Sequence, residues 1–175
     1  MTSPRDLSTL NSWHADWAGL RVGVLGLGVT GFSVADTLAE LGAKVMVVAS
    51  GADELRITMV DVIGATYVQE RSGEDIPHEL VEFDPELIVV SPGYHPDHEI
   101  LLWAAARNIP IWGDIELAWR VRDKVKAAEW LAVTGTNGKT TTVQLTAAML
   151  AAAGYRVAPC GNIGVPVLDA VRDPQ

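Results

Sequence analysis

Apolar segments of strand length alternate with amphipathic segments along residues 20–122, and this alternation limits the chain to one class of fold. Strands that alternate with helices are joined by right-handed crossovers into a parallel sheet with helices on both faces. The sequence therefore predicts an α/β, Rossmann-like domain. The expected strands are residues 21–25, 44–48, 66–69, 86–90 and 109–112, and the expected helices are residues 32–41, 53–63, 99–107 and 114–122.

A glycine motif follows the first expected strand. Residues 26–31 read Gly-Leu-Gly-Val-Thr-Gly, a spacing that permits a tight turn and close approach of a diphosphate to the backbone. A dehydrogenase also needs an acid at the end of the second strand for the ribose hydroxyls, but this strand ends in Ala49 and Ser50. Asp53 is expected to open the next helix instead. A diphosphate ligand other than NAD is favoured, with Ser50 or the local backbone near its base.

A second glycine motif lies at residues 133–142, which read Val-Thr-Gly-Thr-Asn-Gly-Lys-Thr-Thr-Thr. It follows strand-like residues 130–133 and precedes a helical pattern over residues 143–153. Backbone N–H groups and the positive end of that helix suit a polyphosphate, as in a P-loop. Lys139 can then reach the β- and γ-phosphates, and the Thr140 hydroxyl can ligate Mg²⁺. A glycine turn that only caps a helix leaves Lys139 unexplained.

Charged residues cluster at positions 120–126 and mark the expected boundary between two units. We expect a Rossmann-like domain at residues 1–122 and the start of a P-loop domain at residues 123–175. Residues 156–158 are expected to form another strand of the second unit. A P-loop domain needs several strands to bury its first helix, so we expect this second unit to be cut short.

Composition excludes several classes of partner. The formal net charge is −9 and no basic run occurs, which argues against nucleic acid and anionic membrane as partners. The single cysteine, Cys160, cannot form an internal disulfide and indicates a reducing compartment. No segment has the pattern of a signal peptide or the apolar length to span a bilayer. We therefore expect a cytoplasmic protein.

Taken together, the ordered motifs resemble the Mur ligase family. They are the first glycine motif, Ser-Pro-Gly at 91–93, the P-loop-like run at 135–141, and Gly-Asn-Ile-Gly-Val-Pro at 161–166. The segment Gly-Asp-Ile-Glu-Leu at 113–117 agrees as well. Each motif alone is weak or moderate, but their order and spacing agree over residues 20–171. The strict P-loop pattern has a glycine five residues before Gly138, where this chain has Val133. Val133 agrees with the resemblance, because the P-loop of this family commonly lacks that glycine.

The resemblance implies a three-domain, ATP-dependent ligase of peptidoglycan precursor synthesis, closest to the branch that adds D-glutamate to UDP-N-acetylmuramoyl-L-alanine (UDP-MurNAc-L-Ala). ATP phosphorylates the alanyl carboxylate, and the amine of D-glutamate attacks the resulting acyl phosphate. By match to the family, Lys139 and Thr140 are the catalytic pair, and Thr140 is the Mg²⁺ ligand. The implied ATP-binding residues are Gly135, Thr136, Asn137, Gly138, Lys139, Thr140 and Thr141, and the implied substrate-binding residues are Gly28, Val29, Thr30, Ser50, Ser91, Pro92, Gly93 and Asn162.

The family's remaining catalytic and metal-binding residues cannot be placed in this chain, so we expect it to be inactive as a ligase by itself. Many relatives carry an acid where this chain has Ala49, which leaves the uracil contacts open. An NAD-dependent oxidoreductase and a non-catalytic nucleotide-binding module remain the alternatives. His95 and His98 are expected in a solvated loop rather than a metal site.

Overall fold

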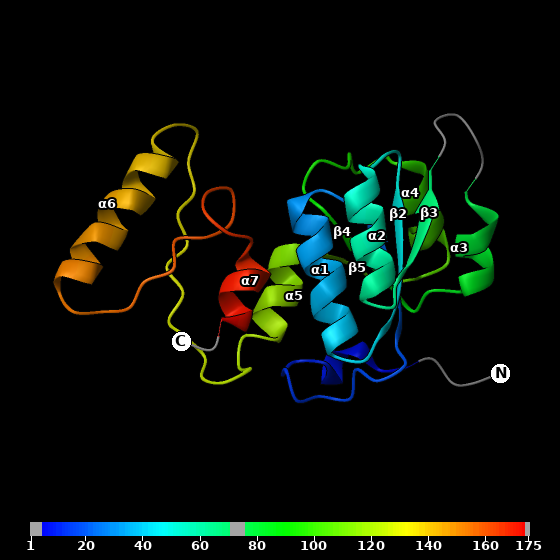
Figure 1. Ribbon diagram of the computed structural model, residues 1–175, viewed down its shortest axis with the longest axis horizontal. Coiled ribbons are helices and arrows are strands. Elements are labelled where there is room, and N and C mark those ends of the chain that lie inside the picture. Colours follow the sequence, from blue (N-terminus) through cyan, green and yellow to red (C-terminus); the bar gives the residue numbers. More distant parts are fainter. Residues whose placement is uncertain (1–4, 71–75, 174–175) are drawn as a thin grey trace.

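The computed structural model describes residues 5–70 and 76–173 of the chain. These residues form one five-stranded sheet in the order β3-β2-β1-β4-β5, in which every neighbouring pair is parallel (Figure 1). The predicted α/β, Rossmann-like class is confirmed for this part of the chain. The strands are β1 (Arg21–Leu25), β2 (Lys44–Ala49), β3 (Thr66–Gln69), β4 (Leu87–Val90) and β5 (Ile111–Gly113).

Helices cover both faces of the sheet, and each face has its own apolar core. The larger core lies under α1 (Val29–Glu40), α2 (Glu54–Val62), α5 (Asp114–Arg120) and α7 (Val167–Arg172). The smaller core lies under α3 (His78–Phe83) and α4 (Glu99–Ala106).

Side-chain alternation within the strands explains the two cores. Successive residues of a strand point to opposite faces, so Val45 and Val47 enter the larger core while Met46 and Val48 enter the smaller one. A strand buried on both faces reads as a continuous apolar run, which is how β1, β2 and β4 appear in the sequence. A continuous apolar run in the sequence therefore indicates a strand in the centre of the sheet.

Most predicted elements appear close to their expected bounds. β1 and β3 begin and end at the predicted residues, whereas α1 begins three residues earlier than predicted, inside the first glycine motif. The helices α3 and α7 were not predicted. Each has only six residues, too few for a clear helical period. Before β1, a short 3₁₀ helix, η1 (Leu7–Thr9), precedes Leu10 and Trp17, which are both buried.

The expected strands at residues 130–133 and 156–158 do not form, so these two predictions are wrong for this chain. A strand must pair its N–H and C=O groups with a neighbour, and the described residues place no other strand beside either segment. The helix between them, α6 (Lys139–Ala152), stands away from the sheet, and none of its residues is buried by the described chain (Figure 1). The chain returns to the body at α7, which packs on α1 and α5.

Candidate functional site

The order of the strands indicates a ligand site at the carboxyl ends of the central strands. The chain order reverses between β1 and β4, and ligands of open parallel sheets bind outside the carboxyl ends of the strands at such a switch. The first glycine motif follows β1 there, and Ser91 follows β4. The structure thus brings together two predicted substrate segments that are 60 residues apart in the sequence.

The first glycine motif is shaped for close packing. Gly26 has a φ of +98°, and its N–H donates to the carbonyl oxygen of Val48 at 2.8 Å. A Cβ on Gly31 would lie 2.1 Å from the carbonyl oxygen of Gly26, so only glycine fits where α1 packs on the turn. This is the role that the G-x-G-x-x-G spacing predicts for its last glycine.

The start of α1 offers hydrogen-bond donors to a ligand. Gly28 is its N-terminal cap and supplies no side-chain hydrogen bond. The first helical hydrogen bond runs from the N–H of Phe32 to the carbonyl oxygen of Gly28 at 3.0 Å. The N–H groups of the helix's first turn therefore precede the intrahelical ladder, and together with the helix dipole they favour an anion. Val29 is 61% exposed at this position.

The hydroxyl of Ser91 is buried beside the same turn. Among the described residues its Oγ has no hydrogen-bond partner. It lies 3.1 Å from where a Cβ on Gly26 would be, and 2.9 Å from where one on Gly31 would be. A buried hydroxyl without a partner is costly, so a polar ligand atom at this place would gain a ready donor. Pro92 and Gly93, which follow it, are exposed.

Ser50 directly follows β2, at the same carboxyl end of the sheet, and it is exposed. As predicted, Asp53 opens the following helix: its carboxylate accepts a hydrogen bond from the N–H of Arg56 at 2.9 Å. The Arg56 guanidinium in turn donates to the carbonyl oxygen of Leu27 at 3.0 Å. This places a cation beside the first glycine motif, which the sequence analysis missed. The sequence feature that could have predicted it is a basic residue, Arg56, in the first turn of the helix that follows the second strand.

His98 lies in the predicted loop, directly before α4, but it is less solvated than predicted, because only 27% of its side chain is exposed. Its Nε2 lies 3.0 Å from a carboxylate oxygen of Glu70, and its Nδ1 is buried without a partner among the described residues. The hydroxyl of Tyr94 donates to the other oxygen of Glu70 at 3.4 Å. Burial, followed by the negative charge of Glu70, raises the pKa of Tyr94 above its usual value. His95 and Asp97 are exposed and contact each other, as expected for that loop.

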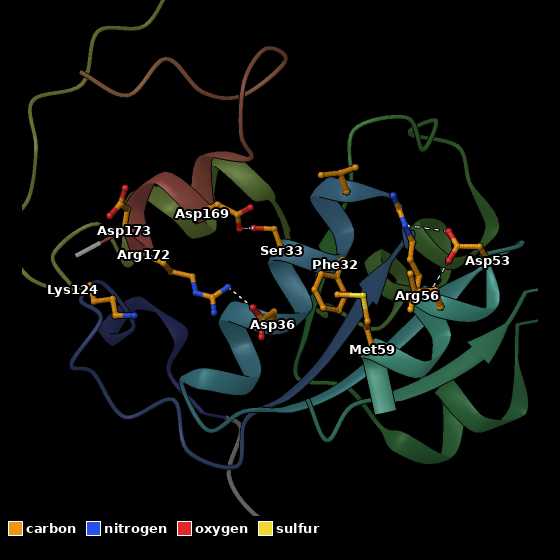
Figure 2. Close-up of a pocket in the computed structure, with 12 residues that line it drawn as sticks. Phe32, Ser33, Asp36, Asp53, Arg56, Met59, Lys124, Asp169, Arg172 and Asp173 are labelled. Carbon is orange, nitrogen blue, oxygen red and sulfur yellow. Dashed lines mark hydrogen bonds and ion pairs between the residues drawn. The ribbon is translucent and has the colours of Figure 1, made fainter. Parts of the chain in front are cut away.

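A cavity of about 740 Å³ lies between α1, α2 and α7 (Figure 2). Val29 is the one predicted substrate residue among the described residues that line it. Arg56 lines the α2 side, and polar contacts between α1 and α7 line the other side. Asn162 lies exposed in the loop that leads into α7.

The predicted P-loop residues stay together at the start of α6. Gly138 caps this helix with a φ of +76°, and Thr140 and Thr141 are exposed in its first turn. The ammonium of Lys139 donates to the carbonyl oxygens of its own loop, those of Gly135 and Thr136. The structure does not bring this loop to the switch between β1 and β4, because α6 stands apart from the sheet (Figure 1).

Two features are absent from the described residues. No group of three or more His, Cys, Asp or Glu side chains that could hold a metal ion occurs among them. None of the helices in this part of the chain is both long enough and apolar enough to span a bilayer. Burial raises the pKa of the Cys160 thiol, which packs half-buried against the larger core.

Comparison with known proteins gives two family matches. Residues 20–113 match the model described as Mur ligase MurD-like, N-terminal domain, and residues 133–170 match the Mur ligase middle domain. A solved structure of UDP-N-acetylmuramate:L-alanyl-gamma-D-glutamyl-meso-diaminopimelate ligase from Neisseria meningitides aligns over 85% of this chain and 46% of its own. Its TM-score is 0.52 at 23% sequence identity, a likeness that concerns the fold alone.

Curated relatives extend the match to almost the whole chain. UDP-N-acetylmuramoylalanine–D-glutamate ligase of Leifsonia xyli is 65% identical, over 99% of this chain and 35% of the relative. The ligase of the same name from Tropheryma whipplei is 52% identical, over 95% of this chain and 34% of the relative. The chain thus spans about a third of the length of these relatives. With its MurD-like N-terminal domain at the sheet and its match to the middle domain beyond, the chain belongs to the Mur ligase family.

Proposed function

We propose that this chain binds UDP-MurNAc-L-Ala for the ATP-dependent addition of D-glutamate, a step of peptidoglycan precursor synthesis in the cytoplasm. The observation that carries the proposal is the buried Ser91 hydroxyl, which has no hydrogen-bond partner among the described residues and lies beside the start of α1, at the switch between β1 and β4. The names of the curated relatives support the substrate and the amino acid. Since the chain spans about a third of those relatives, the complete reaction belongs to a longer protein.

In this proposal the diphosphate lies at the start of α1. Gly28, Val29 and Thr30 supply backbone N–H groups, and the Ser91 hydroxyl donates to a phosphate or sugar oxygen. Arg56 adds positive charge next to the same turn. This cation matters in a chain of net charge −9, because it offsets the general repulsion of an anionic ligand.

The remaining substrate contacts follow the same path. The uracil base lies near Ser50, while Pro92 and Gly93 border the sugar. Asn162 reaches the substrate from the loop before α7. Ala49 is buried and offers no carboxylate to the base, so we assign the base contacts to Ser50 and the local backbone.

In this proposal the start of α6 binds a nucleoside triphosphate, ATP, together with Mg²⁺. Gly138 adopts a φ that favours glycine and adds no side chain to the loop, and the exposed first turn of α6 presents Thr140. The remaining proposed contacts to ATP come from the same loop and the first turn of α6, at Gly135, Thr136, Asn137 and Thr141. Bound ATP supplies the phosphoryl group that turns a carboxylate oxygen into a leaving group. Lys139 would exchange its hydrogen bonds to the loop carbonyls for phosphate oxygens, and Thr140 would ligate the Mg²⁺.

We place the substrate domain at residues 1–122 and the start of the ATP-binding domain at residues 123–175. The chain covers 35% and 34% of the two curated ligases. We therefore propose that the chain binds the UDP-sugar but does not form the amide bond by itself.

Calorimetric titration of the chain with UDP-MurNAc-L-Ala tests this proposal, with UDP and NAD as comparison ligands. We expect saturable binding of UDP-MurNAc-L-Ala, weaker binding of UDP and none of NAD. Substitution Arg56→Ala should weaken both uridine ligands, whereas Arg107→Ala, a change at an exposed arginine of the far face, should not. Binding of NAD in place of the uridine ligands would overturn the proposal in favour of an oxidoreductase.

A further inference from the structure

Polar contacts between α1 and α7 join the two parts of the chain that match different family domains. The Ser33 hydroxyl of α1 donates to Asp169 of α7 at 2.5 Å, and the Arg172 guanidinium donates to Asp36 at 2.5 Å (Figure 2). Arg172 also reaches Glu40 at 2.9 Å. We call these contacts the α1–α7 seam.

The seam fixes how the two helices are aligned. Both contacts, Ser33 with Asp169 and Asp36 with Arg172, join residues that are 136 positions apart in the sequence. An α-helix rises about 1.5 Å per residue, so equal separations at two successive turns mean that α1 and α7 run in the same direction and stay level. By the same offset Pro166, the residue before α7, is level with Thr30 at the start of α1.

This alignment determines where the loop before α7 lies. Residues 161–165 precede Pro166, so they lie at the end of the molecule where the first glycine motif opens (Figure 1). Asn162 belongs to this loop. Its placement at this end of the molecule follows from the α1–α7 seam, because α6, the one helix of the described structure between α5 and α7, has no buried residue.

The polar contacts of the α1–α7 seam fix the alignment of the two helices, which apolar contacts alone leave free. Val167 and Leu168 are buried and hold α7 to the body. Apolar burial is non-directional, so it tolerates a slide or rotation of one helix along the other. Hydrogen bonds to charged groups are directional, and the partly buried side chains of Arg172 and Asp36, 21% and 29% exposed, lose little strength to water.

We infer that Arg172, with Asp36 and Glu40, is a positioning residue for substrate binding. It sets the level of α7 on α1 so that Asn162 completes the site begun by the first glycine motif. This inference rests on the proposed function, because it assumes that Asn162 contacts the sugar–alanine part of UDP-MurNAc-L-Ala. UDP lacks that part of the ligand, so its binding is independent of the seam.

The test is a calorimetric double-mutant cycle on the 175-residue chain, with Arg172→Ala, Asn162→Ala and both together. We expect each single change to weaken UDP-MurNAc-L-Ala about tenfold, and the double change to weaken it no further. Affinity for UDP should stay unchanged in all three variants, which shows that the sheet domain is intact. Arg156→Ala is the matched control, because Arg156 is exposed and no hydrogen bond or ion pair is recorded for it in the described structure.

Restoring the charge pair separates positioning from a general loss of packing. The exchange Asp36→Arg with Arg172→Asp should recover most of the affinity that either single reversal removes. An Arg172→Ala variant that binds UDP-MurNAc-L-Ala like the unmodified chain would overturn the inference. So would losses from Arg172→Ala and Asn162→Ala that multiply in the double variant.

A ligand-free measurement keeps this result distinct from failure of the proposed function. Cys160 is half-buried against the larger core next to the loop in question, and it is the chain's single cysteine. Arg172→Ala should speed alkylation of Cys160 several-fold, whereas Arg156→Ala should not. If the unmodified chain binds neither uridine ligand, the proposed function fails. An unchanged alkylation rate then overturns the seam as well.

Discussion

Gly31 packs so closely on Gly26 that a Cβ on Gly31 would lie 2.1 Å from the Gly26 carbonyl oxygen. Backbone cannot move aside as a flexible side chain can, so this contact ties the first turn of α1 to the end of β1. The open N–H groups of that turn are held at the switch between β1 and β4 as a result.

Gly31→Ala should therefore lower the free energy of unfolding by about 1–3 kcal/mol, the usual cost of overpacking a well-packed position. Urea unfolding monitored by tryptophan fluorescence measures the change. Gly28→Ala is the control, because Gly28 has a negative φ and a Cβ there would meet nothing within 4 Å. Equal stability of the two variants would show that α1 does not press on the turn in this way.

Ser91→Ala should separate stability from binding. The Ser91 hydroxyl is buried without a partner among the described residues, so its removal should leave the free energy of unfolding unchanged or raise it slightly. The same change should weaken UDP-MurNAc-L-Ala, by a factor on the order of ten, because the ligand loses a hydrogen bond in a buried place. Urea unfolding and calorimetry on one preparation give both numbers. Unaltered affinity would remove Ser91 from the proposed site.

Tyr94 should make the protein sensitive to alkaline pH. Its pKa is raised above the ordinary 10.0 in the folded chain, first by burial and then by the charge of Glu70. The unfolded chain therefore loses the phenolic proton first, and the stability due to Tyr94 is complete below pH 10 and declines as the pH rises above it.

Urea unfolding at pH 8.5 and pH 11 measures this effect. Tyr94→Phe should reduce the fall in stability between the two values, because phenylalanine has no proton to lose. Tyr155→Phe should not, since Tyr155 is 67% exposed. The same fall in both variants would assign the alkaline sensitivity to other groups.

Lys139→Ala should affect phosphoryl transfer and spare the UDP-sugar. In a full-length ligase that carries this segment, loss of the ammonium should lower kcat by on the order of 10²–10³-fold, because it neutralises charge that develops on the phosphates. Calorimetry on the present chain should show UDP-MurNAc-L-Ala binding unchanged, since α6 stands apart from the sheet. Lys126→Ala, at an exposed lysine before the loop, is the control. Near-normal turnover of the Lys139 variant would contradict the P-loop assignment.

The sequence predicted the sheet domain well for a local reason. Strands buried on both faces need continuous apolar runs, and helices between them need turns, so β1, β2, β3 and α2 could be placed within a few residues. The glycine spacing at residues 26–31 likewise reports a close backbone approach that the structure contains. These features depend on residues near one another in the chain.

The predictions that failed depended on partners far away in sequence. A strand at residues 130–133 needs a neighbouring strand. His98 is only partly exposed because it pairs with Glu70, which follows a different strand. The six-residue α7 has too little period to be recognised, and what holds it is its packing on α1 and α5.

The sequence by itself thus determined the α/β class, the two glycine motifs and the family resemblance, because each is written in local spacing. Only the tertiary structure decided that Ser91 is buried beside Gly26, that Arg56 lies next to the first glycine motif, and that Arg172 aligns α7 with α1. Those relationships join residues from separate elements. Their distances are set by the packing of helices on a common sheet, which no local pattern specifies.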